Sequence, residues 1–171
     1  MYKANQFNPM LSEHLDLFTM CQSETAERLG IHNVPHDEEV IENLRLLCRE
    51  VLNPAIAHFD LPLFVTSGYR CQRLNEEVGG LPHSQHLYGQ AADILMGGLR
   101  NDELAKWLMD NVDFDEIILE MYDPRCGEYG WVHVSYSAAN NRKQVSTFDG
   151  ETFHEGFHYL DLGAKAENPV G

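Results

Sequence analysis

Apolar residues recur at helical spacing in the first third of the chain and in short runs typical of strands after residue 63. Five apolar positions follow Asp37 at helical spacing (40, 44, 47, 48 and 51), so we expect an amphipathic helix that ends at Asn53-Pro54. The first thirty-odd residues predict short helices, one of them capped by Ser23 and stopped at Gly30. Two further helices are expected at residues 71–78 and 101–111, the second capped by Asn101.

Strand-like runs occupy residues 63–66, 91–95, 116–120, 131–135 and 144–148. Strands near one another with helices packed on one side favour an α+β domain over a doubly wound sheet. The length of 171 residues suits one domain, which we expect to span residues 1–171. Within it, residues 1–36 form a helical N-terminal part, residues 63–148 form the core around the candidate site, and residues 163–171 form a tail.

Charge and targeting signals restrict the partners of the protein. The chain carries 27 acidic and 12 basic residues, a formal net charge of −15. Nucleic acids and anionic membranes are polyanions, so neither is an expected partner. No apolar run approaches a membrane span, and the charged residues Lys3, Glu13 and Asp16 interrupt any signal-peptide core. We therefore expect synthesis in the cytoplasm without a signal peptide. The four widely spaced cysteines are expected to be buried free thiols.

Two strands and one loop carry candidate metal ligands. Alternation in the run 131–135 puts His133 on the opposite face from the two valines that enter the core. Asp93 lies in an apolar strand, where a carboxylate is unfavourable unless a cation or strong donors meet it. Together with His86 these residues predict a zinc site with three protein ligands and an open position, the pattern of catalytic zinc. Taken alone, the pattern also fits a hydrogen-bonded core histidine and an aspartate that caps a turn.

Further short elements occur in a fixed order between residues 23 and 135. They are Ser23-x-Thr25-Ala26, Ile31-x-Asn33-x-Pro35, Ser67-Gly68-Tyr69-Arg70, Leu74-Asn75, Val78-Gly79-Gly80, Ser84-x-His86, Gly89-x-Ala91-Ala92-Asp93-Ile94 and Trp131-x-His133-x-Ser135. Together they resemble the zinc D-Ala-D-Ala carboxypeptidase family, whose members cleave peptidoglycan and share their fold with the hedgehog signalling domain. The first two elements are similar to the bacterial and phage branch. The resemblance implies a small, mostly antiparallel sheet and one Zn²⁺ bound by His86, Asp93 and His133.

The resemblance also implies substrate-binding residues. Arg70 matches the family's arginine that grips substrate, and a guanidinium suits either a terminal carboxylate or a carbonyl oxygen that gains negative charge. The alternative for Arg70 is a surface arginine in a turn. Ser84 is expected either to hydrogen-bond the substrate or to cap its own loop.

Two glutamates are candidates for the general base. Many relatives carry an acidic residue three positions before the last histidine ligand, where this chain has Gly130. Glu120 ends a segment that resembles the family's Asp-x-x-Ile-x-Glu pattern, and a hairpin would lay it beside strand 131–135. Glu128 precedes His133 by five residues in the connecting loop. We favour Glu120 on hairpin geometry.

These features predict a monomeric zinc metallopeptidase that hydrolyses bacterial cell-wall stem peptides, as a D-Ala-D-Ala carboxypeptidase or an endolysin-type endopeptidase. Release through a holin pore, or packaging in a virion, would bring it to its substrate. One alternative is a catalytically inactive zinc-binding structural or interaction module, which Gly130 favours slightly. Another is a cytoplasmic dipeptidase. The motif from His154 to His158 matches H-E-x-x-H, but its central glycine predicts a turn or loose tail instead of a zinc-binding helix.

Overall fold

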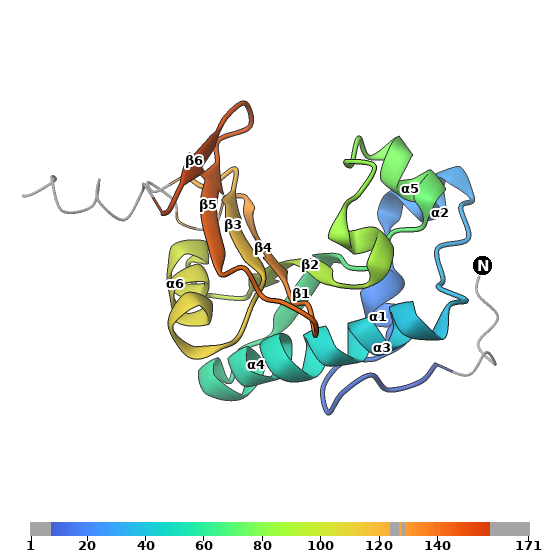
Figure 1. Ribbon diagram of the computed structural model, residues 1–171, viewed down its shortest axis with the longest axis horizontal. Coiled ribbons are helices and arrows are strands. Elements are labelled where there is room, and N and C mark those ends of the chain that lie inside the picture. The colour runs from blue at the N-terminus through green and yellow to red at the C-terminus, as the bar shows by residue number, and fades with distance from the viewer. Residues whose placement is uncertain (1–7, 124–126, 128, 158–171) are drawn as a thin grey trace, which may run out of the picture.

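A sheet with the strand order β1-β2-β4-β3-β5-β6 forms the centre of the computed structural model, which describes residues 8–123, 127 and 129–157. Neighbouring strands are antiparallel except β3 and β5, which are parallel. The architecture confirms the predicted α+β domain with a mostly antiparallel sheet (Figure 1). The strands are β1 (Leu63–Ser67), β2 (Ala91–Met96), β3 (Glu116–Glu120), β4 (Trp131–Ser135), β5 (Gln144–Phe148) and β6 (Phe153–Glu155).

Strands β3, β4 and β5 have the predicted bounds, and β1 and β2 are each one residue longer than predicted. Strand β6 was not predicted, because three residues are too few to show an alternating pattern. It pairs with β5 after a turn in which the carboxylate of Asp149 accepts hydrogen bonds from two backbone N–H groups. The rings of Phe148 and Phe153 stack with centroids 4.5 Å apart, so tertiary contact defines this strand.

The helices are α1 (Leu17–Cys21), α2 (Glu24–Leu29), α3 (Glu38–Leu47), α4 (Asn53–Phe59), α5 (Gln72–Glu77) and α6 (Asn101–Asn111). A π-helical turn, η1 (Cys48–Leu52), joins α3 directly to α4, so the predicted helix end at Asn53-Pro54 is wrong. The N–H of Asn53 donates to the carbonyl of Cys48, five residues back. Pro54 falls in the first turn of α4, directly after the π turn, and the chain stays helical to Phe59.

Asn101 is not the cap of α6 but its first residue, which corrects the second helix prediction. The side chain is buried, with 1% of its surface exposed. Its amide donates to the carbonyl oxygens of Tyr129 and Gly130 at 3.3 and 3.2 Å. The residue therefore holds the end of the β3–β4 connection against the start of α6, a role that no local pattern in the sequence marks.

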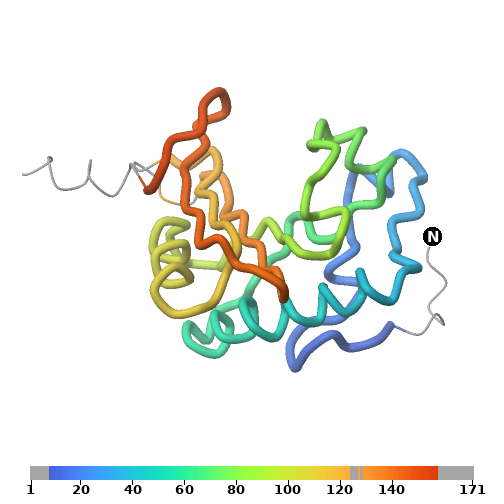
Figure 2. Tube along the Cα trace, viewed as in Figure 1, coloured from blue at the N-terminus to red at the C-terminus, as the bar shows by residue number. Residues whose placement is uncertain are grey.

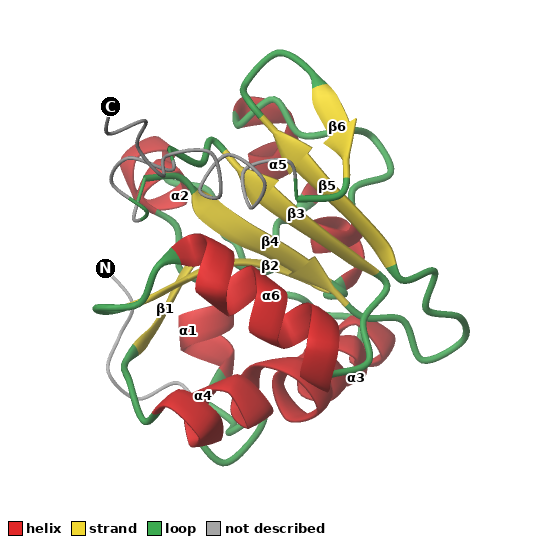
Figure 3. Ribbon diagram, turned by 90° about the vertical axis from the view of Figure 1, so that its left-hand side faces the viewer, coloured by secondary structure: helices red, strands yellow, loops and turns green. Residues whose placement is uncertain are grey.

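Helices α3, α4 and α6 cover one face of the sheet (Figure 3). The side chains that point into this core alternate along the central strands and are fully buried: Ala92, Ile94, Ile117, Leu119, Val132 and Val134. The alternate positions of the same strands therefore lie on the opposite face, as the sequence predicted for His133, and Asp93 lies on that face too. None of the helices in the described part of the chain is long and apolar enough to span a bilayer.

The connection from β1 to β2 leaves the sheet toward α2 and returns (Figure 2). It contains α5 and a 3₁₀ turn, η2 (Gln85–Tyr88). In Figure 1, α2 and α5 stand at the opposite end of the molecule from α6 and β6, with β2 between them. Arg70, near the start of this connection, lies beside His86, near its end. The N–H of Arg70 donates to the carbonyl oxygen of His86 at 3.1 Å.

Candidate metal centre

Three side chains from η2, β2 and β4 converge on one point of the open sheet face. Nε2 of His86 lies 3.3 Å from Nδ1 of His133 and 3.4 Å from Oδ1 of Asp93. Nδ1 of His133 lies 2.9 Å from Oδ1 of Asp93. All three residues are buried, and they form the one group of potential ligands that converges in this way within the described residues.

These separations fit a metal ion. Zinc ligands lie at about 2.0–2.2 Å, which in tetrahedral geometry places donor atoms about 3.3–3.6 Å from one another. The distances from Nε2 of His86 agree with this value, and the separation between His133 and Asp93 is slightly shorter. Two imidazoles and one carboxylate are also ligands that zinc accepts. The site can therefore hold a zinc ion on three protein ligands with a further position left open.

A hydrogen bond fixes the tautomer of His86. Its Nδ1 donates to the carbonyl oxygen of Gly68 at 2.7 Å, which leaves an unprotonated Nε2 directed at Asp93 and His133. Residue 68 must be glycine, because a Cβ there would lie 2.3 Å from the carbonyl oxygen of Met20. One proton can bridge Asp93 and His133, but the lone pair of His86 still faces the carboxylate at 3.4 Å. A cation bound between the three side chains would accept the lone pairs of both imidazoles and balance the charge of the carboxylate.

Electrostatics favours the metal-binding forms of His86 and Asp93, whereas it favours the protonated form of His133 while no metal is bound. Burial lowers the pKa of His86, so its neutral form is preferred. Burial alone would raise the pKa of Asp93, but the charges and hydrogen bonds of His86 and His133 outweigh it and the pKa is lowered. Burial likewise opposes the charged form of His133, whereas its hydrogen bond to Asp93 raises its pKa. A dication would displace the remaining proton and bind the carboxylate ionised.

The sheet register explains why distant stretches of chain meet at this point. Asp93 and His133 are direct cross-strand partners in the antiparallel pair β2–β4. Because side chains alternate, both point away from the helices, and η2 delivers His86 above them. Asp115, just before β3, accepts a hydrogen bond at 2.9 Å from Gln85, the residue preceding His86. The turn that carries His86 is thereby tied to the sheet.

Arg70 lies beside the three ligands, and its guanidinium keeps an N–H donor that is not hydrogen-bonded. Its side chain is half-buried, and its Nε is buried without a hydrogen-bond partner. Burial lowers its pKa, and the negative charges of Asp93 and Glu120 act in the opposite direction. Nη2 of Arg70 approaches Oγ of Ser84 at 3.5 Å, and Ser84 makes no side-chain capping bond to η2. Arg70 is therefore only partly exposed to solvent, and the Ser84 hydroxyl lies beside its guanidinium and does not cap η2.

Glu120 ends β3 on the same face as the ligands. It pairs directly with Trp131, and Ile118 pairs with His133, so the hairpin places Glu120 where the sequence predicted. Burial and the charge of Asp93 raise the pKa of the Glu120 carboxyl, while His133, Trp131 and Arg70 oppose this shift. The indole N–H of Trp131 neighbours this carboxyl, although it makes no hydrogen bond of good geometry.

The position where relatives carry an acidic residue cannot hold any side chain here. Gly130 has φ of +80°, and a Cβ at this position would lie 1.9 Å from the carbonyl oxygen of Glu120. Glycine at 130 therefore allows the hairpin to close tightly behind Glu120. Glu128, the other base candidate, lies outside the described residues.

The H-E-x-x-H match does not form a zinc helix. His154 lies in β6, and its Nε2 is 2.9 Å from a carboxylate oxygen of Asp149. A strand places residues on alternating faces and so cannot present the helical i, i+4 pair that the motif requires. His158 lies outside the described residues.

Asn33 supports the site, but sequence reasoning gave it no role. Its Nδ2 donates to the carbonyl oxygens of Cys21 and Tyr69, and its Oδ1 accepts from the N–H of Cys71, all within 2.9 Å. This buried amide ties the N-terminal helices to the loop that carries Arg70. Its place in the element Ile31-x-Asn33-x-Pro35 was the available signal.

A buried His-Asp-His set on an open sheet face, with an arginine and a glutamate beside it, defines a metal-dependent hydrolase. Residues 13–135 match the model of the Peptidase M15 family. The match covers most of the chain and all three candidate ligands, so the protein belongs to Peptidase M15, the zinc D-Ala-D-Ala carboxypeptidase family. It is a metallopeptidase of that family. No curated protein matches the chain.

Proposed function

We propose that this protein is a zinc-dependent peptidase that hydrolyses stem peptides of the bacterial cell wall. The observation that carries the proposal is the position of the Glu120 carboxyl on the same sheet face as His133, beside three converging ligands. Family membership supports a peptide as the substrate. The unpartnered Nε of Arg70 supports recognition of an anionic or carbonyl oxygen, such as the terminal carboxylate of a D-alanine.

Each residue has a distinct task in the proposed mechanism. His86, Asp93 and His133 hold the ion, and zinc, when bound, supplies Lewis-acid polarisation of the scissile carbonyl and activation of water. Glu120 accepts the proton that the attacking water loses and passes it to the leaving amine. Arg70 orients the substrate through its guanidinium, and Ser84 adds a hydroxyl at the same position.

The test separates metal binding from proton transfer. Purified protein loaded with zinc should release D-alanine or muropeptide fragments from peptidoglycan, detected by mass spectrometry. Glu120→Gln should lower the turnover number at least about 100-fold while zinc stoichiometry stays unchanged. Glu116→Gln is the matched control, because Glu116 begins the same strand and also lies on the ligand-bearing face. Equal activity of Glu120→Gln and the parent protein would remove Glu120 from this role.

The alternatives predict different results in the same assay. A zinc-binding module without catalysis would hold zinc and cut no peptidoglycan or free peptide. A dipeptidase would cut free D-alanyl-D-alanine and leave intact wall untouched. The position of Glu120 on the ligand-bearing face supports the peptidase over the inactive module, although residue 130 is glycine.

Assembly and delivery belong to the same proposal. We propose a monomer that reaches the wall through a holin pore or inside a virion. Sedimentation of the purified protein tests the first part. Detection of the protein in purified virions, or wall lysis that depends on a co-expressed holin, tests the second.

A further inference from the structure

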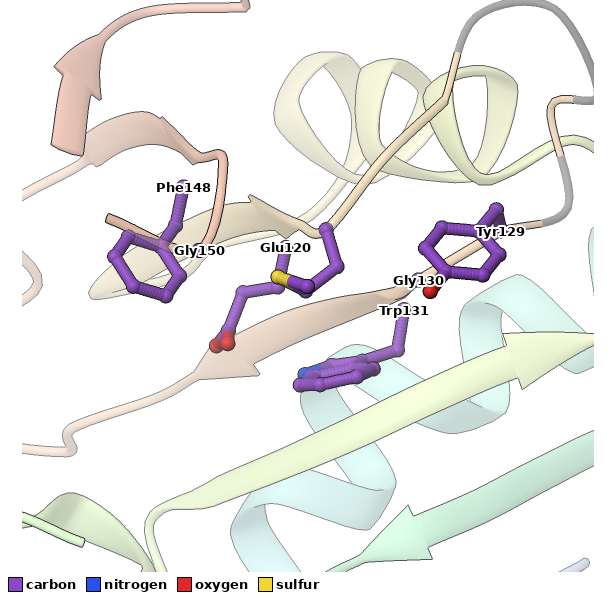
Figure 4. Close-up of a pocket in the computed structure, with 7 residues that line it drawn as sticks. Glu120, Tyr129, Gly130, Trp131, Phe148 and Gly150 are labelled. Atoms are coloured by element: carbon purple, nitrogen blue, oxygen red, sulfur yellow. The ribbon is translucent and has the colours of Figure 1, made fainter. Parts of the chain in front are cut away.

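An open pocket lies beside the metal centre, between the ends of β3, β4 and β5. Its volume is about 410 Å³, and it is lined by Glu120, Met121, Tyr129, Gly130, Trp131, Phe148 and Gly150. Figure 4 shows Phe148 and Gly150 on one side, Tyr129 and Trp131 on the other, and Glu120 between them. The lining thus combines three aromatic rings and a thioether with a single carboxylate.

The charge of the residues that line the pocket favours a cationic ligand over an anionic one. Glu120 is the ionisable acid of the pocket, and no lysine, arginine or histidine lines it within the described residues. Two further acidic residues, Asp149 and Glu151, follow in the adjacent β5–β6 turn. An anionic group would be repelled here, whereas the faces of tryptophan, tyrosine and phenylalanine attract cations. An apolar chain that ends in a positive charge complements both parts of the lining.

We propose that this pocket is a specificity subsite for a lysine-type side chain, an unbranched alkyl stem with a terminal ammonium, on the peptide next to the scissile bond. The stem packs between the rings of Tyr129 and Phe148, and the ammonium lies against Trp131 and the carboxyl of Glu120. The position next to the scissile bond rests on the proposed function, because Glu120 borders both the pocket and the metal centre. The cation preference of the pocket does not depend on hydrolysis.

Gly150 and Gly130 allow the close packing that forms the wall of the pocket. A Cβ at residue 150 would lie 2.9 Å from Sδ of Met121, and a Cβ at residue 130 would clash with the backbone of Glu120. Tyr129 is 60% exposed, so its ring contributes little to the core and is available to a ligand. Its replacement can therefore test the subsite without unfolding the protein.

The test is a binding titration that needs no turnover. The chain has two tryptophans, so Trp107→Phe leaves Trp131 as the fluorescent reporter within the pocket. Zinc-loaded Trp107→Phe protein is titrated with Nα-acetyl-lysine N-methylamide and with the matched norleucine and glutamate derivatives. We expect a saturable change in Trp131 fluorescence and an affinity at least about fivefold higher for lysine than for norleucine. The glutamate derivative should bind more weakly than either.

Variants of the lining sharpen the result. Tyr129→Ala should weaken binding of the lysine derivative several-fold, and Glu120→Gln should make the lysine and norleucine derivatives bind equally. Phe64→Ala is the matched control, because Phe64 is an exposed aromatic residue on β1, outside the pocket, and its loss should change neither affinity. Equal binding of lysine and norleucine derivatives to the parent protein, tighter binding of glutamate, or no saturable change with any probe would overturn the proposal.

The same probes distinguish this inference from the proposed function. If peptides are hydrolysed with no preference for lysine over norleucine in either flanking position, the peptidase assignment stands and the subsite is wrong. If the lysine derivative binds as expected but no peptide is cut, the cation pocket stands and the peptidase assignment fails.

Discussion

Asp93 and His133 face each other directly across β2 and β4, with Oδ1 of the carboxylate 2.9 Å from Nδ1 of the imidazole. The pair occupies the face of the sheet that the helices leave open. His86 completes it from η2, with its Nε2 3.4 Å from the same carboxylate oxygen. The metal centre is therefore built on two rigid strands and one turn, an arrangement that fixes ligand positions before any ion binds.

Replacing Asp93 by asparagine should remove tight zinc binding. The neutral amide is a weaker ligand and no longer balances the charge of the ion, so we expect the zinc affinity to fall more than about 100-fold. Competition with a chromophoric chelator measures this change. Zinc should also raise the melting temperature of the parent protein and leave that of the variant unchanged.

The control for this experiment is Asp102→Asn, since Asp102 lies on α6 and pairs with Arg100 instead of facing the ligands. Its zinc affinity should equal that of the parent protein. Retention of parental affinity by Asp93→Asn would place the ion elsewhere.

Gly130→Ala should destabilise the protein by about 2–4 kcal/mol, measured by urea denaturation. Both the positive φ of +80° and the 1.9 Å approach to the carbonyl oxygen of Glu120 oppose a side chain. Gly98→Ala is a close control, because Gly98 has φ of +78° but nothing lies within 4 Å of its added Cβ. It should cost only about 1 kcal/mol. Equal losses for the two variants would mean that the hairpin relaxes easily around residue 130.

Asp115→Asn should lower the free energy of unfolding at neutral pH and have little effect in acid. Burial disfavours the charged form of Asp115, but hydrogen bonds from Arg142 and Gln85 outweigh it and lower its pKa. A carboxyl with a lowered folded pKa stabilises the fold above its unfolded pKa, and this contribution disappears as the pH falls through the folded value. We expect a difference of about 1–2 kcal/mol at pH 7, because the Arg142 side chain is half-exposed and solvent screens the pair.

Urea denaturation of the parent and variant proteins between pH 7 and pH 2 checks this dependence. Asp110→Asn, which removes an exposed ion pair with Lys106 on α6, should show at most a few tenths of a kcal/mol at any pH. A difference for Asp115→Asn that stays constant down to the lowest pH would contradict the assignment.

Asn33→Ala should cost about 2–4 kcal/mol of stability, because three buried hydrogen bonds lose their shared partner. The loop that carries Arg70 should loosen as well, and hydrogen exchange at the N–H of Cys71 should become faster. Asn43→Ala removes a single exposed bond to the carbonyl oxygen of Tyr88 and provides the comparison. Unchanged exchange at Cys71 would show that the loop does not depend on Asn33.

The strands and the positions of Asp93 and His133 were accessible from sequence because both depend on alternation over a few residues. Val132 and Val134 enter the core and His133 faces away from it, as the local pattern required. The resemblance to a known family then identified which of nine histidines belong together. The continuation of the helix through Pro54 was not accessible, because a π turn depends on how α3 and α4 pack and not on residue preference at one position.

The sequence by itself determined the α+β class and the periodicity of the central strands, since these depend on residue type and spacing, and its resemblance to a known family indicated the three candidate ligands. The tertiary structure decided that Glu120 lies on the ligand-bearing face of the sheet, why residue 130 is glycine, and which aromatic rings meet in a pocket. The physical reason is that Glu120, Trp131 and Phe148 come from three strands and are brought together by sheet register and close packing. Neither register nor packing is encoded in any one segment of the chain.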